Sequence, residues 1–112
     1  MTEILHCVYD GPVWGINRKI VKAGQYIVNH AKYTKFKNDL AWTMKAAQEV
    51  DTYTDDVAVY IFQGTEYDVD AFVKPILDAL QIARIVKNDK QARQLHVVRR
   101  EGDIEIAVWG FA

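Results

Sequence analysis

Residues 57–80 read VAVYIFQGTEYDVDAFVKPILDAL, and this stretch predicts a strand, a polar junction and a helix in that order. Residues 57–62 are almost continuously apolar, which indicates a strand buried at the centre of a sheet. After the junction, apolar residues recur at helical spacing: Phe72, Val73, Ile76, Leu77 and Leu80. We expect this helix to run to about Ile82. Pro75 requires it to begin no more than a few residues earlier, because a proline deep in a helix loses a hydrogen bond and clashes with the previous turn.

Ionisable residues gather where the strand gives way to the helix. Asp68 and Asp70 stand two residues apart, and like charges held this close repel each other unless a cation compensates them. Hard cations such as magnesium prefer carboxylate oxygens, and Asp89 adds a third carboxylate from a turn before a later strand. Such an ion polarises a phosphate and lowers the pKa of a bound water molecule. Lys74, one helical turn after Asp70, is placed to steady negative charge on phosphorus or to orient the water.

The same residues also have a purely structural explanation. Asp68 and Asp70 suit the cap of a helix, since a carboxylate accepts hydrogen bonds from the first backbone amides. Asp70, Lys74 and Asp78 are spaced by four residues, so on a helix they share one face and can form a surface ladder of ion pairs. An Asp-x-Asp pair alone does not decide between a metal site and a capped helix.

The rest of the chain predicts an α+β domain around this stretch. Further strands are expected at residues 3–9, 94–99 and 104–109. Residues 19–28 read as a hairpin of two short strands around a glycine turn. Asn29 suits the cap of a long helix with apolar positions at Tyr33, Phe36, Leu40, Met44 and Ala47. The order β, hairpin, α, β, α, β, β predicts a small mixed, largely antiparallel sheet with two packed helices, in a single domain over residues 1–112.

Composition is that of an ordinary soluble protein. Half of the 112 residues are apolar and 26% are charged. No apolar run approaches the ~20 residues that span a bilayer, and the N-terminus lacks the pattern of a signal peptide, so we expect no membrane partner. Cys7 is the only cysteine, which excludes an intrachain disulfide and favours a reducing cytoplasm.

The net charge of −1 conceals an uneven distribution. Residues 1–50 carry seven Lys or Arg against four Asp or Glu, residues 51–80 carry one against seven, and residues 81–112 carry six against four. An acidic block between basic segments suits a metal site whose polyanionic substrate is held by other residues. The alternative is that these charges only solvate the surface.

The run from Asp68 to Leu80, with Asn88-Asp89 after it, resembles the RusA-type Holliday-junction resolvases of bacteria and their phages. That family carries Asp-x-Asp-Asn, a Lys often followed by Pro, then Asp-Ala-Leu and a later Asp-Asp pair, and the spacing agrees here without a gap. Two positions depart from this pattern, because Ala71 stands where the family has Asn and Asn88 where it has the first acid of the later pair.

The resemblance implies a homodimeric, magnesium-dependent endodeoxyribonuclease, with manganese as a substitute metal. Such an enzyme nicks four-way DNA junctions symmetrically during recombination and repair. The resemblance also implies that Asp68, Asp70 and Asp89 are the metal ligands, and that these three together with Lys74 are the catalytic residues.

Junction DNA also needs cations that hold phosphates rather than read bases. The candidates are Arg18, Lys19, Lys32, Lys35, Lys87, Lys90 and Arg93. Binding through phosphates predicts recognition of junction shape and a strong dependence on salt. Two other functions stay open at this point. One is a catalytically impaired module of the same fold that binds DNA junctions, and the other is a magnesium-dependent enzyme for a small phosphorylated substrate.

Overall fold

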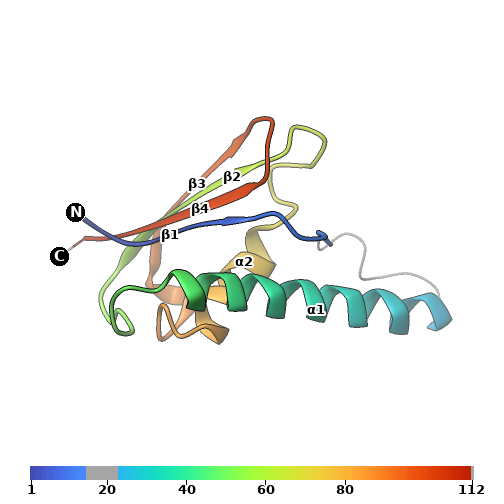
Figure 1. The fold of residues 1–112 in the computed structure, drawn as a ribbon, viewed down its shortest axis with the longest axis horizontal. Coiled ribbons are helices and arrows are strands. Elements are labelled where there is room, and N and C mark those ends of the chain that lie inside the picture. The colour runs from blue at the N-terminus through green and yellow to red at the C-terminus, as the bar shows by residue number, and fades with distance from the viewer. Residues whose placement is uncertain (15–22, 112) are drawn as a thin grey trace.

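Figure 1 shows the computed structural model, which describes residues 1–14 and 23–111. Within them the chain forms, in order, β1 (Thr2–Tyr9), α1 (Ala23–Ala47), β2 (Val57–Gln63), α2 (Val73–Ile82), the 3-10 helix η2 (Asp89–Gln91), β3 (Ala92–Arg99) and β4 (Ile104–Gly110). The α+β class predicted from the sequence is confirmed.

The strands form one mixed sheet in the order β1-β4-β2-β3. β4 pairs antiparallel with β1 and β2, whereas β3 lies parallel to β2 at the edge of the sheet. β2 thus has the inner position that its apolar sequence predicts, with Ile61 opposite Ile106 of β4. β3 and β4 follow each other along the chain, joined by a turn in which Gly102 has a φ of 120°. They do not form a hairpin, because β2 lies between them.

Both α-helices lie on the same side of the sheet (Figure 1). Alternate residues of the inner strands supply that side of the core: Val57, Val59, Ile61, Ile104, Ile106 and Val108. The helices cover them with Phe36, Leu40, Met44, Phe72, Ile76 and Leu80. All of these side chains belong to one buried cluster, so the two helices and the sheet share a single core.

The long helix α1 begins earlier in the chain than the sequence predicts. Residues 23–28 lie in its first turns, so the hairpin predicted at 19–28 is wrong for this part, and residues 19–22 lie outside the described residues. Ile27 and Val28 favour strands locally, but each residue added to an existing helix gains a backbone hydrogen bond. The apolar face predicted for this helix is confirmed by the burial of Tyr33, Phe36, Leu40 and Met44. No helix in the described part of the chain is both long and apolar enough to cross a membrane.

The start of α2 confirms the limit that Pro75 sets. The helix begins at Val73 after Phe72, and the first intrahelical hydrogen bond runs from the Ile76 amide to the Phe72 carbonyl at 3.0 Å. Pro75 therefore lies in the first turn, where backbone amides have no partner within the helix, and its missing N–H removes no helical hydrogen bond. This boundary leaves Asp68 and Asp70 in the connection between β2 and α2, as predicted.

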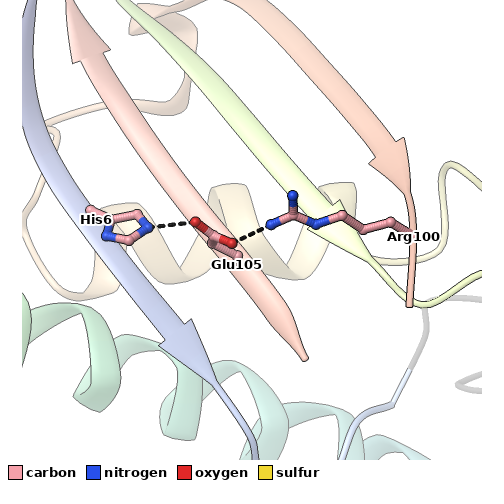
Figure 2. A network of polar contacts seen from close by, with 3 residues as sticks. All are labelled: His6, Arg100 and Glu105. Atoms are coloured by element: carbon pink, nitrogen blue, oxygen red, sulfur yellow. Dashed lines mark hydrogen bonds and ion pairs between the residues drawn. The ribbon is translucent and has the colours of Figure 1, made fainter. Parts of the chain in front are cut away.

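The opposite face of the sheet carries a polar row across its strands (Figure 2). Glu105 on β4 accepts a hydrogen bond from His6 Nε2 on β1 at 2.6 Å, and its other carboxylate oxygen pairs with Arg100. The Arg100 guanidinium lies 4.1 Å from the centre of the Phe62 ring. The hydrogen bond from His6 and the charge of Arg100 hold the pKa of Glu105 below its ordinary value. This row therefore ties the edge strand β1 to the chain segment that follows β3.

Candidate active site

The connection that carries the two acids is fastened to the inner strand β2. Gln63, the last residue of β2, is fully buried, and its Nε2 donates a hydrogen bond to the Asp68 carbonyl at 2.6 Å. The Gln63 carbonyl in turn accepts from the Arg100 amide at 2.7 Å. A buried amide side chain that lost such a partner would keep its desolvation cost. The backbone at Asp68 is therefore held to the centre of the sheet.

Two buried residues hold the other side of this connection. The Ala71 amide donates to the Asp68 carbonyl at 3.0 Å, which closes a turn around Asp70. Ala71 is 7% exposed and Phe72 is fully buried, and the Phe72 ring packs edge-to-face on Phe36 with centroids 5.7 Å apart. Asp68 and Asp70 are exposed between these fixed points. The structure thus presents both carboxylates to solvent on a constrained backbone.

Ala71 also explains one departure from the family pattern. Its methyl group belongs to the buried cluster of the core, where an asparagine side chain would need hydrogen-bond partners for its amide. Asp68 and Asp70 do not require residue 71 to be polar, since they reach solvent on their own.

Lys74 lies in the first turn of α2 and is held by Asp78. Its Nζ is 3.0 Å from Asp78 Oδ1, while Lys37 Nζ of α1 lies 3.5 Å from Asp78 Oδ2. The hydrogen bond to Asp78 and its charge raise the pKa of Lys74, and the charge of Asp89 adds to this effect. One carboxylate therefore links the two helices and keeps the Lys74 ammonium charged beside the acidic connection.

Part of the predicted ion-pair ladder is thus present. The pair Lys74–Asp78 forms, but Asp70 has no ion-pair partner among residues 1–14 and 23–111. Asp78 does more than the predicted ladder required, because its contact with Lys37 joins segments far apart along the chain. In the sequence, the four-residue spacing between Lys74 and Asp78 indicated the ion pair between them.

Asp89 reaches the same side of α2 from the 3-10 helix η2. Its amide donates to Gln81 Oε1 of α2 at 3.1 Å, and its charge acts on Lys74. Asn88 caps η2 by accepting from the Lys90 amide at 2.9 Å, while Gln91 Oε1 accepts from the Asn88 amide at 2.9 Å. The asparagine that replaces an acid of the family pattern therefore serves as a cap, a role that asparagine fills well.

The donor chemistry of the three aspartates fits a hard divalent cation. Asp68 and Asp70 are exposed and Asp89 is half-buried, and carboxylate oxygens are preferred by magnesium. Within the described ranges, however, no group of three or more His, Cys, Asp and Glu side chains stands together as a ready set of metal ligands. The convergence of Asp89 with Asp68 and Asp70 on one ion stays a prediction.

The cations predicted to hold DNA fall into separate groups. Arg18 and Lys19 lie outside the described residues. Lys32 and Lys35 are exposed on α1, where Lys32 Nζ is 4.9 Å from the centre of the Trp14 ring and Lys35 pairs with Asp39 at 2.9 Å. Lys87, Lys90 and Arg93 are exposed around η2 and the start of β3. Lys32 and Lys35 are therefore carried by α1, and the other three cations by the segment that contains η2 and the start of β3.

The single cysteine takes no part in this site. Cys7 is buried in the core, and burial raises the pKa of its thiol to about 11. Since the thiolate is the nucleophilic form, the thiol is inert near neutral pH. Its neighbour His6 lies on the opposite face of β1, where it contacts Glu105.

Comparison with known proteins shows the family to which the chain belongs. A family model described as Endodeoxyribonuclease RusA matches residues 11–109 of the chain, a range that includes Asp68, Asp70, Lys74 and Asp89. No curated protein matches the chain in sequence. Members of the matched family hydrolyse phosphodiester bonds in DNA and act on branched junctions. The chain therefore belongs to the RusA family of endodeoxyribonucleases.

Proposed function

We propose that the protein is a magnesium-dependent homodimer that resolves four-way DNA junctions by symmetric nicking in recombination and repair. The observation that supports this best is the arrangement at the start of α2. Asp68 and Asp70 are exposed on a backbone held by Gln63 and Phe72, and the charges of Asp78 and Asp89 both act on the neighbouring Lys74 ammonium. Such a set suits a phosphodiester whose negative charge grows during hydrolysis.

Asp68, Asp70 and Asp89 are the residues that would hold the divalent cation. When bound, the ion supplies Lewis-acid polarisation of the phosphate and a more acidic water molecule. Lys74 acts as a fixed positive donor toward the phosphate oxygens. Because Asp78 raises the pKa of Lys74, this donor keeps its charge at neutral pH and above. Manganese, which also accepts oxygen ligands, is expected to replace magnesium.

The homodimer follows from the symmetry of the substrate. Two strands of a two-fold symmetric junction are cut, and a dimer with two-fold symmetry presents two equivalent sites. The exposed cations Lys32, Lys35, Lys87, Lys90 and Arg93 are proposed to hold phosphates, together with Arg18 and Lys19. Contacts of this kind make affinity fall steeply with salt. A reducing cytoplasm, which the single cysteine favours, completes the proposal.

The direct test is cleavage of a synthetic four-way junction in magnesium. We expect paired nicks in opposite strands, little cutting of a linear duplex of the same sequence, and loss of nicking by more than about 100-fold in Asp70→Asn. The matched control is Asp103→Asn, an exposed acid in the turn between β3 and β4, which should nick normally.

Other outcomes would point to the competing functions. Junction binding by the unmodified protein without nicking in either metal would identify a binding module of the same fold. Equal inhibition by branched and linear DNA would contradict junction recognition, as expected of an enzyme for a small phosphorylated substrate. Nicking that survives in Asp70→Asn would contradict the assignment of this site.

A further inference from the structure

A second hollow lies at the other end of α2, between this helix and α1. Its volume is about 480 Å³, and it is lined by Asn38, Ala41, Trp42, Lys45, Ile82 and Arg84, among others. None of the residues assigned to catalysis borders it. It is therefore a separate feature from the acidic connection at the start of α2.

The hollow exposes large apolar side chains to water. Trp42 is 75% exposed and Ile82 is 51% exposed. An indole held on a helix surface offers a flat face on which a nucleic-acid base can stack, and such stacking tolerates any base. The helix is already fixed by Leu40 and Met44, which are fully buried on its other side. Trp42 is thus presented on a rigid support without a role in the core.

The charges around the hollow favour an anion. Lys45 and Arg84 line it, and no acid is among its lining residues. Neither cation has an ion-pair partner within residues 1–14 and 23–111. Glu49 and Asp51 line a neighbouring hollow that shares Lys45 with the first one. Asp78, the acid of the hollow along α2, is instead paired with Lys37 and Lys74, so a polyanion is repelled less in the direction of α2.

Arg84 occupies a position that usually belongs to glycine. It has a φ of 59° just after the end of α2, and its amide donates to the Gln81 carbonyl at 3.1 Å. Its own carbonyl accepts from Thr52 Oγ1 at 2.7 Å and from Gln48 Nε2 at 3.4 Å. A left-handed residue with a side chain is strained, and glycine relieves that strain. The fold thus places a guanidinium at the hollow against the local conformational preference.

Next to this hollow lies a second one that includes Asp78, the ion-pair partner of Lys74. A smaller hollow lined by Lys37, Asp78, Gln81 and Ile82 shares Ile82 with the first one. Asp78 in turn contacts Lys74. Ile82 follows Lys74 by eight residues of α2, which corresponds to about 12 Å along the helix axis. A short stretch of one DNA strand can span such a distance.

We infer that the hollow binds an unpaired segment of a DNA strand, with one base stacked on Trp42 and flanking phosphates held by Lys45 and Arg84. This inference rests on the proposed function, since strands pass from one duplex to another at the branch point of a four-way junction, where opening of the terminal base pairs supplies an unpaired segment. Lys37 continues the cationic path toward Lys74. The contacts are to a base face and to phosphates, so the segment is bound without regard to its sequence.

The test is binding of a fluorescein-labelled oligothymidylate of about 20 nucleotides in EDTA, where no cleavage occurs. Trp42→Ala should weaken binding by about 10-fold, which matches the loss of one stacked base. Arg84→Gly should weaken binding and at the same time raise the Tm, because it removes the guanidinium and also relieves the left-handed strain. Arg84→Lys should restore most of the binding at the Tm of the unmodified protein.

If Arg84 binds the ligand, Arg84→Gly lowers the affinity and raises the Tm. If Arg84 has only a structural role, Arg84→Gly lowers both the affinity and the Tm. Unchanged oligothymidylate binding in Trp42→Ala and Arg84→Gly would overturn the inference. So would unchanged binding together with loss of the dimer in Trp42→Ala, because the hollow would then be an interface between copies. Asp70→Asn nicking is measured separately in magnesium, so failure of the proposed function and failure of this inference give different results.

Discussion

The two ends of α2 carry opposite charges on one rigid support. Before its first turn stand the exposed carboxylates of Asp68 and Asp70, and just after its last turn stands the guanidinium of Arg84. The helix dipole favours both arrangements, since its N-terminal end is positive and its C-terminal end negative. One end suits a divalent cation and the other a phosphate. On the proposals above, this short helix aligns the site of cleavage with a site that binds the DNA strand.

The two ends differ in how the fold holds them. The N-terminal end is held from the core, by the Gln63 hydrogen bond to the Asp68 carbonyl and by the buried Phe72. The C-terminal end is held by the Arg84 carbonyl, which accepts hydrogen bonds from the side chains of Gln48 and Thr52 in the segment after α1. Burial positions the start of α2, and a strained backbone positions the segment after its end. A substitution in the common core should therefore affect both ends, whereas a substitution of a surface contact should affect only one.

The largest effect is expected from Phe72→Ala, which should destabilise the packing of α2 and so disturb the sites at both of its ends. Phe72 is fully buried between Phe36 and Tyr67, with ring centroids 5.7 and 4.8 Å away. Removing a buried aromatic ring costs about 3–5 kcal/mol, and urea denaturation measures the loss. The control Val69→Ala removes a side chain that is 52% exposed, and it should change stability by less than about 0.5 kcal/mol. Equal stability of the two variants would show that this ring does not anchor α2.

Lys74→Ala should impair only the proposed active site at the start of α2. We expect single-turnover nicking of a four-way junction to fall by about 10²–10³-fold, as when a donor to a developing anion is lost. Junction affinity in EDTA should stay within a few-fold, because the cations near Trp42 are untouched. Lys74→Arg keeps the charge and should recover part of the rate. A parallel loss of rate and affinity would instead make Lys74 one more phosphate contact.

Asp78→Asn should have a smaller effect, of about 10-fold on the nicking rate, because it releases Lys74 and Lys37 without removing either. The pKa of Lys74 is raised mainly by Asp78, and Asp89 is the other acid acting on it. Activity that needs the ammonium is lost as pH rises through this pKa. The loss should therefore begin at a lower pH in Asp78→Asn. A pH–rate profile of each variant measures this shift. Asp78→Glu should restore the alkaline limit of the unmodified protein. An unshifted alkaline limb in Asp78→Asn would contradict the role of Asp78.

The smallest effect is expected on the open face of the sheet, away from both ends of α2. His6 and Arg100 lower the pKa of Glu105, so the interaction stabilises the fold above the ordinary pKa of about 4.5 and is lost as pH falls through the lowered value. Glu105→Gln should cost no more than about 1 kcal/mol at neutral pH. Its stability should also vary less with pH below 4.5, as urea titrations at several pH values would show. A steeper acid dependence in Glu105→Gln would contradict this account.

Sequence reasoning predicted the centre of the molecule best. The apolar run of β2, the helical spacing of Phe72, Ile76 and Leu80, and the limit set by Pro75 each follow from burial and backbone chemistry close by in the chain. It failed at residues 23–28, where a strand-like sequence extends a helix that is stabilised elsewhere. The separation of β3 from β4 by β2 also depends on pairing between distant segments.

The hollow beside Trp42 shows why the rest of a site escapes such reasoning. Trp42 lies on α1 and Arg84 just after the end of α2, and only the packing of α1 on α2 brings them to one place. Arg84 did leave a signal, because α2 ends without the glycine that commonly follows a helix. Asp68 and Asp70 were singled out by their spacing together with the family resemblance, whereas their relation to Asp89 depends on how η2 returns beside α2.

The most direct measurement is calorimetric titration of manganese into the unmodified protein and into single variants Asp68→Asn, Asp70→Asn and Asp89→Asn. If the three carboxylates act on one ion, each variant should bind manganese at least about 10-fold more weakly, while the control Asp103→Asn binds it normally. Normal manganese binding by Asp89→Asn, with loss in the other two, would contradict the claim that Asp89 completes the site.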